Sequence, residues 1–91
     1  MNNNILSEKD TKAVLGVLVE QLGVPEEQIT PDASLMEDLG ADSLDIAEIT
    51  LAVEERFNLS IPDEQWERVS TVRDLFELLA ELLGGPARQP A

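Results

Sequence analysis

The chain has 91 residues, of which 43 % are hydrophobic, and it contains neither cysteine nor histidine. This size and composition fit one small domain with a single core, and the missing residue types exclude disulfide bonds, cysteine metal sites and, in practice, zinc sites. A formal net charge of −13 argues against nucleic acid and membranes as partners and favours basic patches on other proteins.

The two ends of the chain are expected to lie outside the folded domain. Residues 1–6 are predicted to be flexible, residues 7–83 to form the domain, and residues 84–91 to be a disordered tail. The N-terminal residues lack the positive charge and apolar run of a signal peptide, and no apolar run reaches membrane-spanning length. We therefore expect a cytoplasmic protein, and a monomer.

The first predicted helix covers about residues 7–22. Ser7 followed by Asp10 has the spacing of a capping box, and apolar residues then recur in steps of three and four. Gly23 suits the left-handed residue that ends a helix. Gly16 lies inside this helix, where glycine costs roughly 1 kcal/mol relative to alanine, and we interpret it as a point of close contact with another helix.

A connection of residues 23–41 follows, which is long for so small a domain. Pro25 and Pro31 argue against a continuous helix through it, although a short helical turn fits residues 26–29. Loops of this length are usually functional or mobile. Three apolar residues are spaced to hold the connection against the core: Ile29, Leu35 and Leu39.

The second predicted helix covers residues 43–57 and begins after Asp42, a good N-cap. Asp45 lies three residues further on, where its carboxylate can bind the free amide groups of the first turn. Asn58 suits a left-handed cap, and Leu59 closes the end with an apolar contact. One face of this helix carries the apolar residues Ile46, Ile49, Val53 and Phe57.

Two further helices complete the predicted domain. A short third helix covers residues 63–68, with Trp66 facing inward. Thr71 and Asp74 have the spacing of a capping pair at the start of a fourth helix over residues 72–83. No segment alternates as a strand does, so we predict an all-α fold, a small four-helix bundle of three longer helices and one short helix.

Ser43 lies in the first turn of the second helix, and three interpretations of it compete. It is a small polar residue of a kind common at helix starts, a catalytic nucleophile, or an attachment point for a phosphate-linked group. A nucleophile needs a base, yet the chain has no histidine and its only lysines, Lys9 and Lys12, lie on another predicted helix. The unpaired amides and the dipole of a helix start favour a bound anion. We therefore assign no catalytic residue.

The sequence Gly-Ala-Asp-Ser-Leu-Asp at 40–45 resembles the attachment motif of acyl carrier proteins. The resemblance keeps the family's order and spacing from residue 20 to about residue 79, through segments 20–24, 32–35, 37–40, 54–57 and 61–64. In that family the serine carries 4′-phosphopantetheine, which a phosphopantetheinyl transferase donates from coenzyme A. The resemblance implies that Ser43 carries this cofactor, with Asp42 as part of the motif, and that the protein is a carrier, not an enzyme.

The resemblance also implies partners and cargo. In the family, acidic residues of the second helix dock onto basic patches of the transferase and of acyl-transferring, condensing or acyl-ligating enzymes, and exposed apolar residues add short-range contact. The thiol of the cofactor holds acyl chains as thioesters, and this cysteine-free chain has no thiol of its own. An ordinary solvated helix face is the alternative for the acids. The candidate partner-binding residues are Leu44, Asp45, Glu48, Leu51, Glu54 and Glu55.

Two positions depart from the family pattern. Arg56 stands where the family often has an acid, and we interpret it as a residue that tunes partner choice. Trp66 replaces a smaller residue; we favour a core filler, and the alternative is a residue of the cleft between the second and third helices, where the family shelters an acyl chain. Asp38, Asp42 and Asp45 lack the spacing of a calcium loop, so no metal site is predicted.

Three functions remain open on sequence alone. The first is an acyl carrier of fatty-acid, polyketide or specialised lipid biosynthesis. The second is an aminoacyl or peptidyl carrier, which Ala41-Asp42 before the serine and the strong acidity disfavour. The third is an unmodified acidic helical adaptor that binds a basic partner.

Overall fold

The structure is a computed structural model that describes residues 6–83. Its elements follow in the order α1 (Glu8–Leu22), the 3₁₀ turn η1 (Glu26–Gln28), α2 (Ser43–Phe57), α3 (Asp63–Trp66) and α4 (Val72–Leu82). These elements confirm the predicted all-α fold of three longer helices and one short helix. The predictions for residues 1–5 and 84–91 lie outside the described residues, whereas Leu6 is partly buried against the core.

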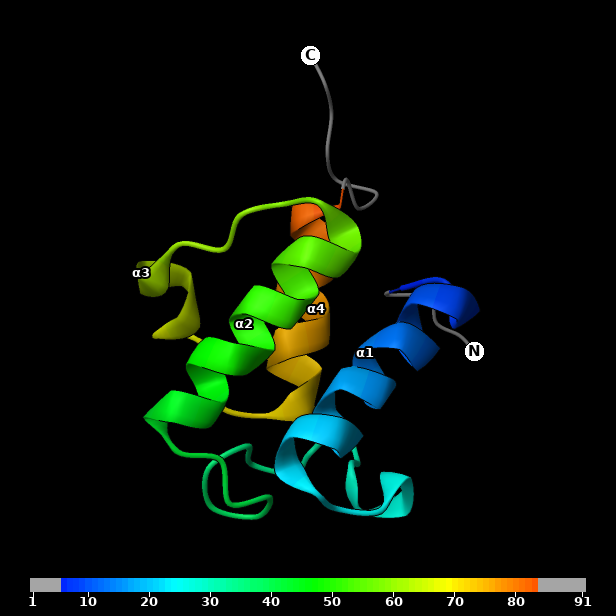
Figure 1. Ribbon diagram of the computed structural model, residues 1–91, viewed down its shortest axis with the longest axis vertical. Coiled ribbons are helices and arrows are strands. Elements are labelled where there is room, and N and C mark those ends of the chain that lie inside the picture. Colours follow the sequence, from blue (N-terminus) through cyan, green and yellow to red (C-terminus); the bar gives the residue numbers. More distant parts are fainter. Residues whose placement is uncertain (1–5, 84–91) are drawn as a thin grey trace.

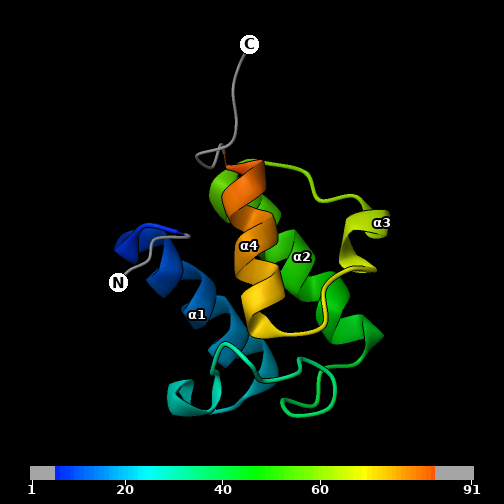
Figure 2. The ribbon, with the colours of Figure 1, turned by 180° about the vertical axis from the view of Figure 1, so that it is seen from behind.

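The three longer helices pack side by side, with the connection between α1 and α2 closing one end of the bundle (Figure 1). α1 runs toward this end, and α2 and α4 both run away from it. The opposite view shows α4 covering the back of α2, and α3 lies beside α2 in both views (Figure 2). The N-terminus of α2 therefore stands at the end of the bundle that the connection encloses.

The core is formed by aliphatic side chains of all three longer helices and of the connection. Burying each large side chain of this kind contributes roughly 1.5–3 kcal/mol. No helix within residues 6–83 combines the length and the apolar character needed to cross a bilayer. The most deeply buried side chains are Val14, Leu18, Leu35, Ile49, Val53, Leu75 and Leu79.

The N-terminus of α2 is fixed by a complete capping box, as predicted. Asp42 Oδ1 accepts a hydrogen bond from the Asp45 amide at 2.9 Å, and Asp45 Oδ2 accepts one from the Asp42 amide at 3.2 Å. Thr71 and Asp74 form the same reciprocal pair at the start of α4. Asn58 ends α2 in the left-handed conformation with φ 56°. Both ends of α2 and the start of α4 are thus specified by local sequence.

The long connection is held against the start of α4 by backbone hydrogen bonds. The Leu35 amide donates to the Ser70 carbonyl at 2.9 Å, and the Val72 amide donates to the Ala33 carbonyl at 3.0 Å. The predicted anchors Ile29, Leu35 and Leu39 are all buried. The predicted helical turn is present as η1, one residue shorter than expected. This segment therefore positions α2 firmly although it is mostly irregular.

The last two helices are shorter than predicted. α3 ends at Trp66 instead of residue 68, because the chain tightens into turns in which the Arg68 and Val69 amides donate to carbonyls only three residues back. α4 ends at Leu82 instead of residue 83. The glycines and the proline expected to stop it, residues 84–86, lie outside the described residues.

α1 differs from the prediction in two details. Ser7 is the N-cap and not a helical residue, and its Oγ accepts the Asp10 amide at 3.1 Å, which is one half of the predicted capping box. Gly16 is exposed, and a Cβ atom placed on it would meet no described atom within 4 Å. The interpretation of Gly16 as a point of close helix contact was therefore wrong.

Because Gly16 has free space around it, we expect Gly16→Ala to raise the free energy of unfolding by about 0.5–1 kcal/mol through better helix propensity. Gly40→Ala is the control, since Gly40 has φ +76° and a side chain there is strained, at a cost of roughly 1–2 kcal/mol. Urea denaturation of both variants measures these changes. A loss of stability in Gly16→Ala would show that the site tolerates no methyl group.

Candidate functional site

Ser43 is the first residue of α2, and its side chain is exposed. Its hydroxyl forms no hydrogen bond with any described residue. The chain just before it is fixed: Gly40 adopts φ +76°, and the buried Ala41 donates its amide to the Leu35 carbonyl at 2.9 Å. A free hydroxyl on a rigid, accessible helix start fits the attachment of a prosthetic group through a phosphodiester bond. The helix-start amides beside it favour the phosphate charge.

Asp45 links this helix start to α1. Besides capping the Asp42 amide, it accepts a hydrogen bond from the Gln21 side chain, with Nε2 3.2 Å from Oδ1. These bonds favour the ionised carboxylate, so the pKa of Asp45 lies below its ordinary value of 3.8, first through the Asp42 amide and then through Gln21. Asp45 therefore both caps the start of α2 and links it to α1, two residues after Ser43.

The lowered pKa of Asp45 predicts a pH-dependent contribution to stability. The unfolded carboxyl binds its proton at higher pH than the folded one, so the contribution is present above the ordinary pKa and is lost as pH falls through the folded value. We expect Asp45→Asn to lower the free energy of unfolding at about pH 6 and to lower it less at about pH 3. Denaturation curves of both proteins at the two pH values test this, and a gap that stays constant or widens in acid would contradict it.

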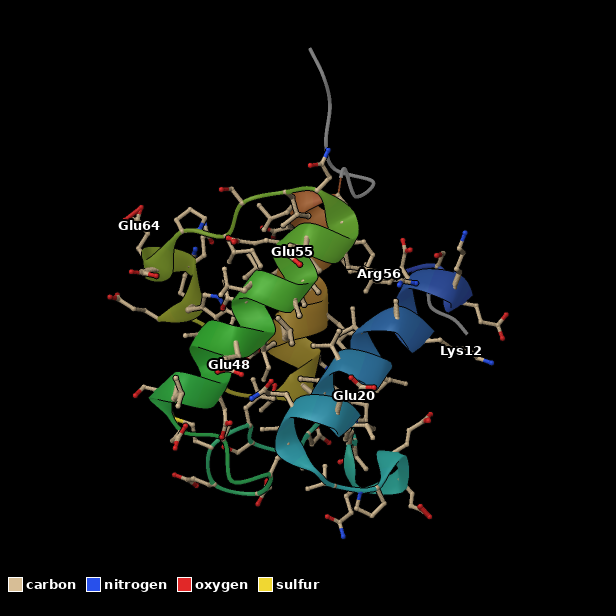
Figure 3. All side chains as sticks on the ribbon, in the orientation of Figure 1. Lys12, Glu20, Glu48, Glu55, Arg56 and Glu64 are labelled. Atoms are coloured by element: carbon tan, nitrogen blue, oxygen red, sulfur yellow. The ribbon has the colours of Figure 1, made fainter. Side chains whose placement is uncertain are left out.

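The candidate partner-binding residues fall into two groups. Leu44 and Leu51 are 65 % and 59 % exposed, which is unusual for leucine, and Glu48 and Glu55 are exposed as well. Figure 3 shows Glu48 and Glu55 on the outer face of α2, with Glu20 of α1 on the same side of the molecule. These four residues of α2, which we call the outer α2 face, are free to meet a partner.

The other two candidates are engaged within the fold. Asp45 is half-buried and bonded as described above. Glu54 is also half-buried, and its Oε2 accepts a hydrogen bond from the Ile61 amide at 2.7 Å, which holds the segment between α2 and α3. Arg56 is exposed in the last turn of α2, on the side toward α1 (Figure 3). A positive charge there interacts favourably with the helix dipole.

A cavity of about 360 Å³ opens beside Ser43. Trp66 has both of the roles that the sequence suggested for it: it packs partly buried against the core, and it also lines this cavity. Its indole Nε1 is buried and has no hydrogen-bond partner among the described residues. Besides Ser43 and Trp66, the walls include the apolar residues Leu35, Met36, Ile46 and Val69.

The hydrogen bonds of Gln21 with Asp45 and of the Ile61 amide with Glu54 were missed by sequence reasoning. Gln21 lies 24 residues from Asp45, and a polar residue near the end of a helix carries no signal of so distant a contact. Within residues 6–83 no group of three or more acidic side chains is arranged to hold a metal ion.

Comparison with known proteins places this chain in a family. The model of the phosphopantetheine attachment site matches residues 12–84. The acyl carrier protein of Syntrophobacter fumaroxidans is 48 % identical over 68 residues, which are 75 % of this chain and 84 % of that protein. The solution structure of a "putative acyl carrier protein" from Anaplasma phagocytophilum matches with a TM-score of 0.75 and 29 % identity, covering 88 % of this chain and 94 % of that one.

The helical fold and the matched attachment-site model define a phosphopantetheine-binding carrier domain. The identity and coverage go further: the chain belongs to the acyl carrier protein family. Members of this family hold covalent phosphopantetheine and act as carriers for acyl-handling enzymes. The membership of the acyl carrier protein family, which the sequence motif predicted, is thus confirmed.

Proposed function

We propose that Ser43 Oγ bears the 4′-phosphopantetheine and that the thiol of this group carries acyl chains between successive enzymes. The observation that carries the proposal is the exposed, unbonded Ser43 hydroxyl at the head of a helix fixed by a capping box. Asp42 belongs to the site as the N-cap that sets this helix start. Ser43 is also inside the stretch that the attachment-site model matches.

The bound group supplies a thiol on a flexible arm. The chain has no thiol of its own, because it contains no cysteine. The residues around Ser43 fix the origin of that arm, because the capping box and the buried Ala41 hold the helix start in place. Tethering the cargo to a docked carrier raises its effective concentration at the partner's active site. The rigid base and the flexible arm therefore have separate roles.

Loading the phosphopantetheinylated protein distinguishes the acyl carrier from its alternatives. We expect an acyl-ligating enzyme with a fatty acid and ATP to form a thioester on the protein, and an amino-acid-activating enzyme to form none. Intact-mass spectrometry detects either product. Efficient aminoacylation without acylation would identify an aminoacyl or peptidyl carrier, and a protein that no transferase modifies would favour the unmodified adaptor.

We further propose that partners dock on the outer α2 face, formed by Leu44, Glu48, Leu51 and Glu55. The two exposed leucines supply apolar contact, and the two exposed acids steer basic partners, including the transferase, into register. Asp45 and Glu54 support this face indirectly. Their carboxylates accept hydrogen bonds within the fold and so stabilise the helix that presents the face. Arg56, at the end of the same helix, remains our candidate for tuning partner choice.

Charge reversal on the outer α2 face is expected to slow modification. We expect Glu48→Lys combined with Glu55→Lys to lower the kcat/KM of the transferase about tenfold or more at low salt, because steering by complementary charge is lost. The control is Glu77→Lys combined with Glu81→Lys, which makes the same change in net charge on α4. Added salt should shrink the difference between the two double variants. An equal loss in both would show that only net charge matters.

A further inference from the structure

Arg56 is the single basic residue of α2, a helix that otherwise carries only acidic charges: Asp45, Glu48, Glu54 and Glu55. Its side chain is exposed, and within residues 6–83 it takes part in no ion pair; the pair found there joins Arg73 to Asp32. An acid three or four residues away along the chain could have paired with it. Those four positions hold Ala52, Val53, Leu59 and Ser60. The guanidinium group is therefore available to a partner outside the fold.

Arg56 lies at the edge of the outer α2 face, at the end far from Ser43. It directly follows Glu55, and Figure 3 shows it in the same view as Glu48 and Glu55, on the side of α2 that faces α1. Its position thirteen residues after Ser43 corresponds to about 20 Å along the helix axis. A partner that contacts Glu55 while it reaches Ser43 therefore also meets Arg56.

The two signs of charge on this face call for opposite groups on the partner. Basic side chains that attract Glu48 and Glu55 would repel Arg56 if they continued over it, because like charges brought together at an interface oppose docking. A carboxylate at that point removes the repulsion. It also fits the guanidinium group well, since the planar fork of N–H donors binds both oxygens of a carboxylate.

We propose that the phosphopantetheinyl transferase of the same organism carries a carboxylate opposite Arg56, at the margin of the basic patch that receives the outer α2 face. The inference rests on the proposed function, since it takes the transferase to dock on that face. Arg56 thereby favours a transferase with this mixed patch over one whose patch is uniformly basic. It lies too far from the Ser43 hydroxyl to act on the reaction itself, so its role is in partner specificity.

Reversing the charge at position 56 tests the proposal by the sign of the effect. We expect Arg56→Glu to lower the kcat/KM of this transferase about threefold to tenfold at low salt, although the variant makes the docking helix more acidic. Added salt should shrink the loss. A uniformly basic patch would instead favour the added acid, so an unchanged or raised kcat/KM would overturn the proposal.

Arg68→Glu is the control for this measurement. It makes the same change in net charge at an exposed residue in the turn after α3 and should leave kcat/KM close to the wild-type value. Circular dichroism checks that both variants are folded, as their exposed positions lead us to expect. An equal loss in the two variants would trace the effect to net charge and would also overturn the proposal.

Cross-linking locates the carboxylate directly and needs no charge reversal. Arg56→Lys places a primary amine at the position, and a carbodiimide couples this amine to a carboxylate in contact with it, forming an amide while the carbodiimide takes up the water. In the complex with the transferase, we expect tandem mass spectrometry to find position 56 joined to an aspartate or glutamate of the transferase. Arg68→Lys should give no such product at position 68. If Glu48 or Glu55 is cross-linked to transferase lysines and position 56 is not cross-linked, the proposal is wrong.

The proposed function fails separately from this inference. If the transferase adds no group to the wild-type protein, the carrier function itself is wrong, and the inference about Arg56 falls with it. If the wild type is modified but Arg56→Glu is modified as fast or faster, the carrier function stands and only the carboxylate opposite Arg56 is rejected.

Discussion

Ser43→Ala is expected to abolish phosphopantetheine attachment completely, because the substitution removes the hydroxyl oxygen that forms the phosphodiester bond. The fold should be unaffected, since Ser43 is exposed and Asp42, not Ser43, caps α2. Intact-mass spectrometry after incubation with a phosphopantetheinyl transferase, coenzyme A and Mg²⁺ measures the outcome.

Ser60→Ala is the matched control for this experiment. Ser60 is an exposed serine in the segment between α2 and α3, and it belongs to neither helix. It should be modified as fully as the wild type. Modification of Ser43→Ala to the wild-type extent would show that another residue carries the group.

Leu35→Ala is expected to destabilise the fold by about 2–5 kcal/mol, more than any of the other substitutions proposed above. Leu35 is 2 % exposed, and it joins the connection to the rest of the fold. Its amide binds the Ser70 carbonyl, and its carbonyl accepts the Ala41 amide just before the capping box. A total stability of about 5–15 kcal/mol is typical of such domains, so this loss is a large fraction of it. Urea denaturation followed by circular dichroism measures the change.

Leu51→Ala is the control for the core substitution, and it should behave in the opposite way. Leu51 is 59 % exposed, so its loss should change stability by no more than about 0.5 kcal/mol. It belongs to the outer α2 face, and its removal should weaken partner docking while the fold remains intact. Equal destabilisation by the two variants would mean that Leu35 does not anchor the connection.

The bounds of α2 and the anchors of the connection before it could be predicted from local sequence. The bounds of α2 were predicted correctly because Asp42, Asp45 and Asn58 are cap residues whose preferences act within one helical turn. Ile29, Leu35 and Leu39 were recognised as anchors because of their spacing along the connection, and all three are buried. Where a few neighbouring residues decide the structure, sequence reasoning was enough.

Contacts between distant segments could not be read in the same way. The bond of Gln21 to Asp45 joins two helices, and the bond of Glu54 to the Ile61 amide depends on how the chain turns after α2. Two of the candidate partner-binding acids, Asp45 and Glu54, therefore accept hydrogen bonds within the fold. Gly16 was misjudged because free space beside a helix depends on what packs there.

A cleft between the second and third helices was expected only from the family resemblance, and most of the residues that line it could not be read from the sequence. The sequence left Trp66 as a core filler or as a residue of a cleft, and the structure shows a side chain that does both. Trp66 is the last residue of α3, a helix of only four residues. Such a short element has little intrinsic preference of its own, so tertiary packing decides its position.

The measurement that tests the central claim most directly is peptide mapping of the wild-type protein after exposure to a phosphopantetheinyl transferase and coenzyme A. Proteolysis followed by tandem mass spectrometry locates the added group on a single residue. We predict one phosphopantetheine per chain, on the peptide that contains Ser43 and on that side chain. A protein that remains unmodified in the presence of an active transferase, or that carries the group on another residue, would contradict this account.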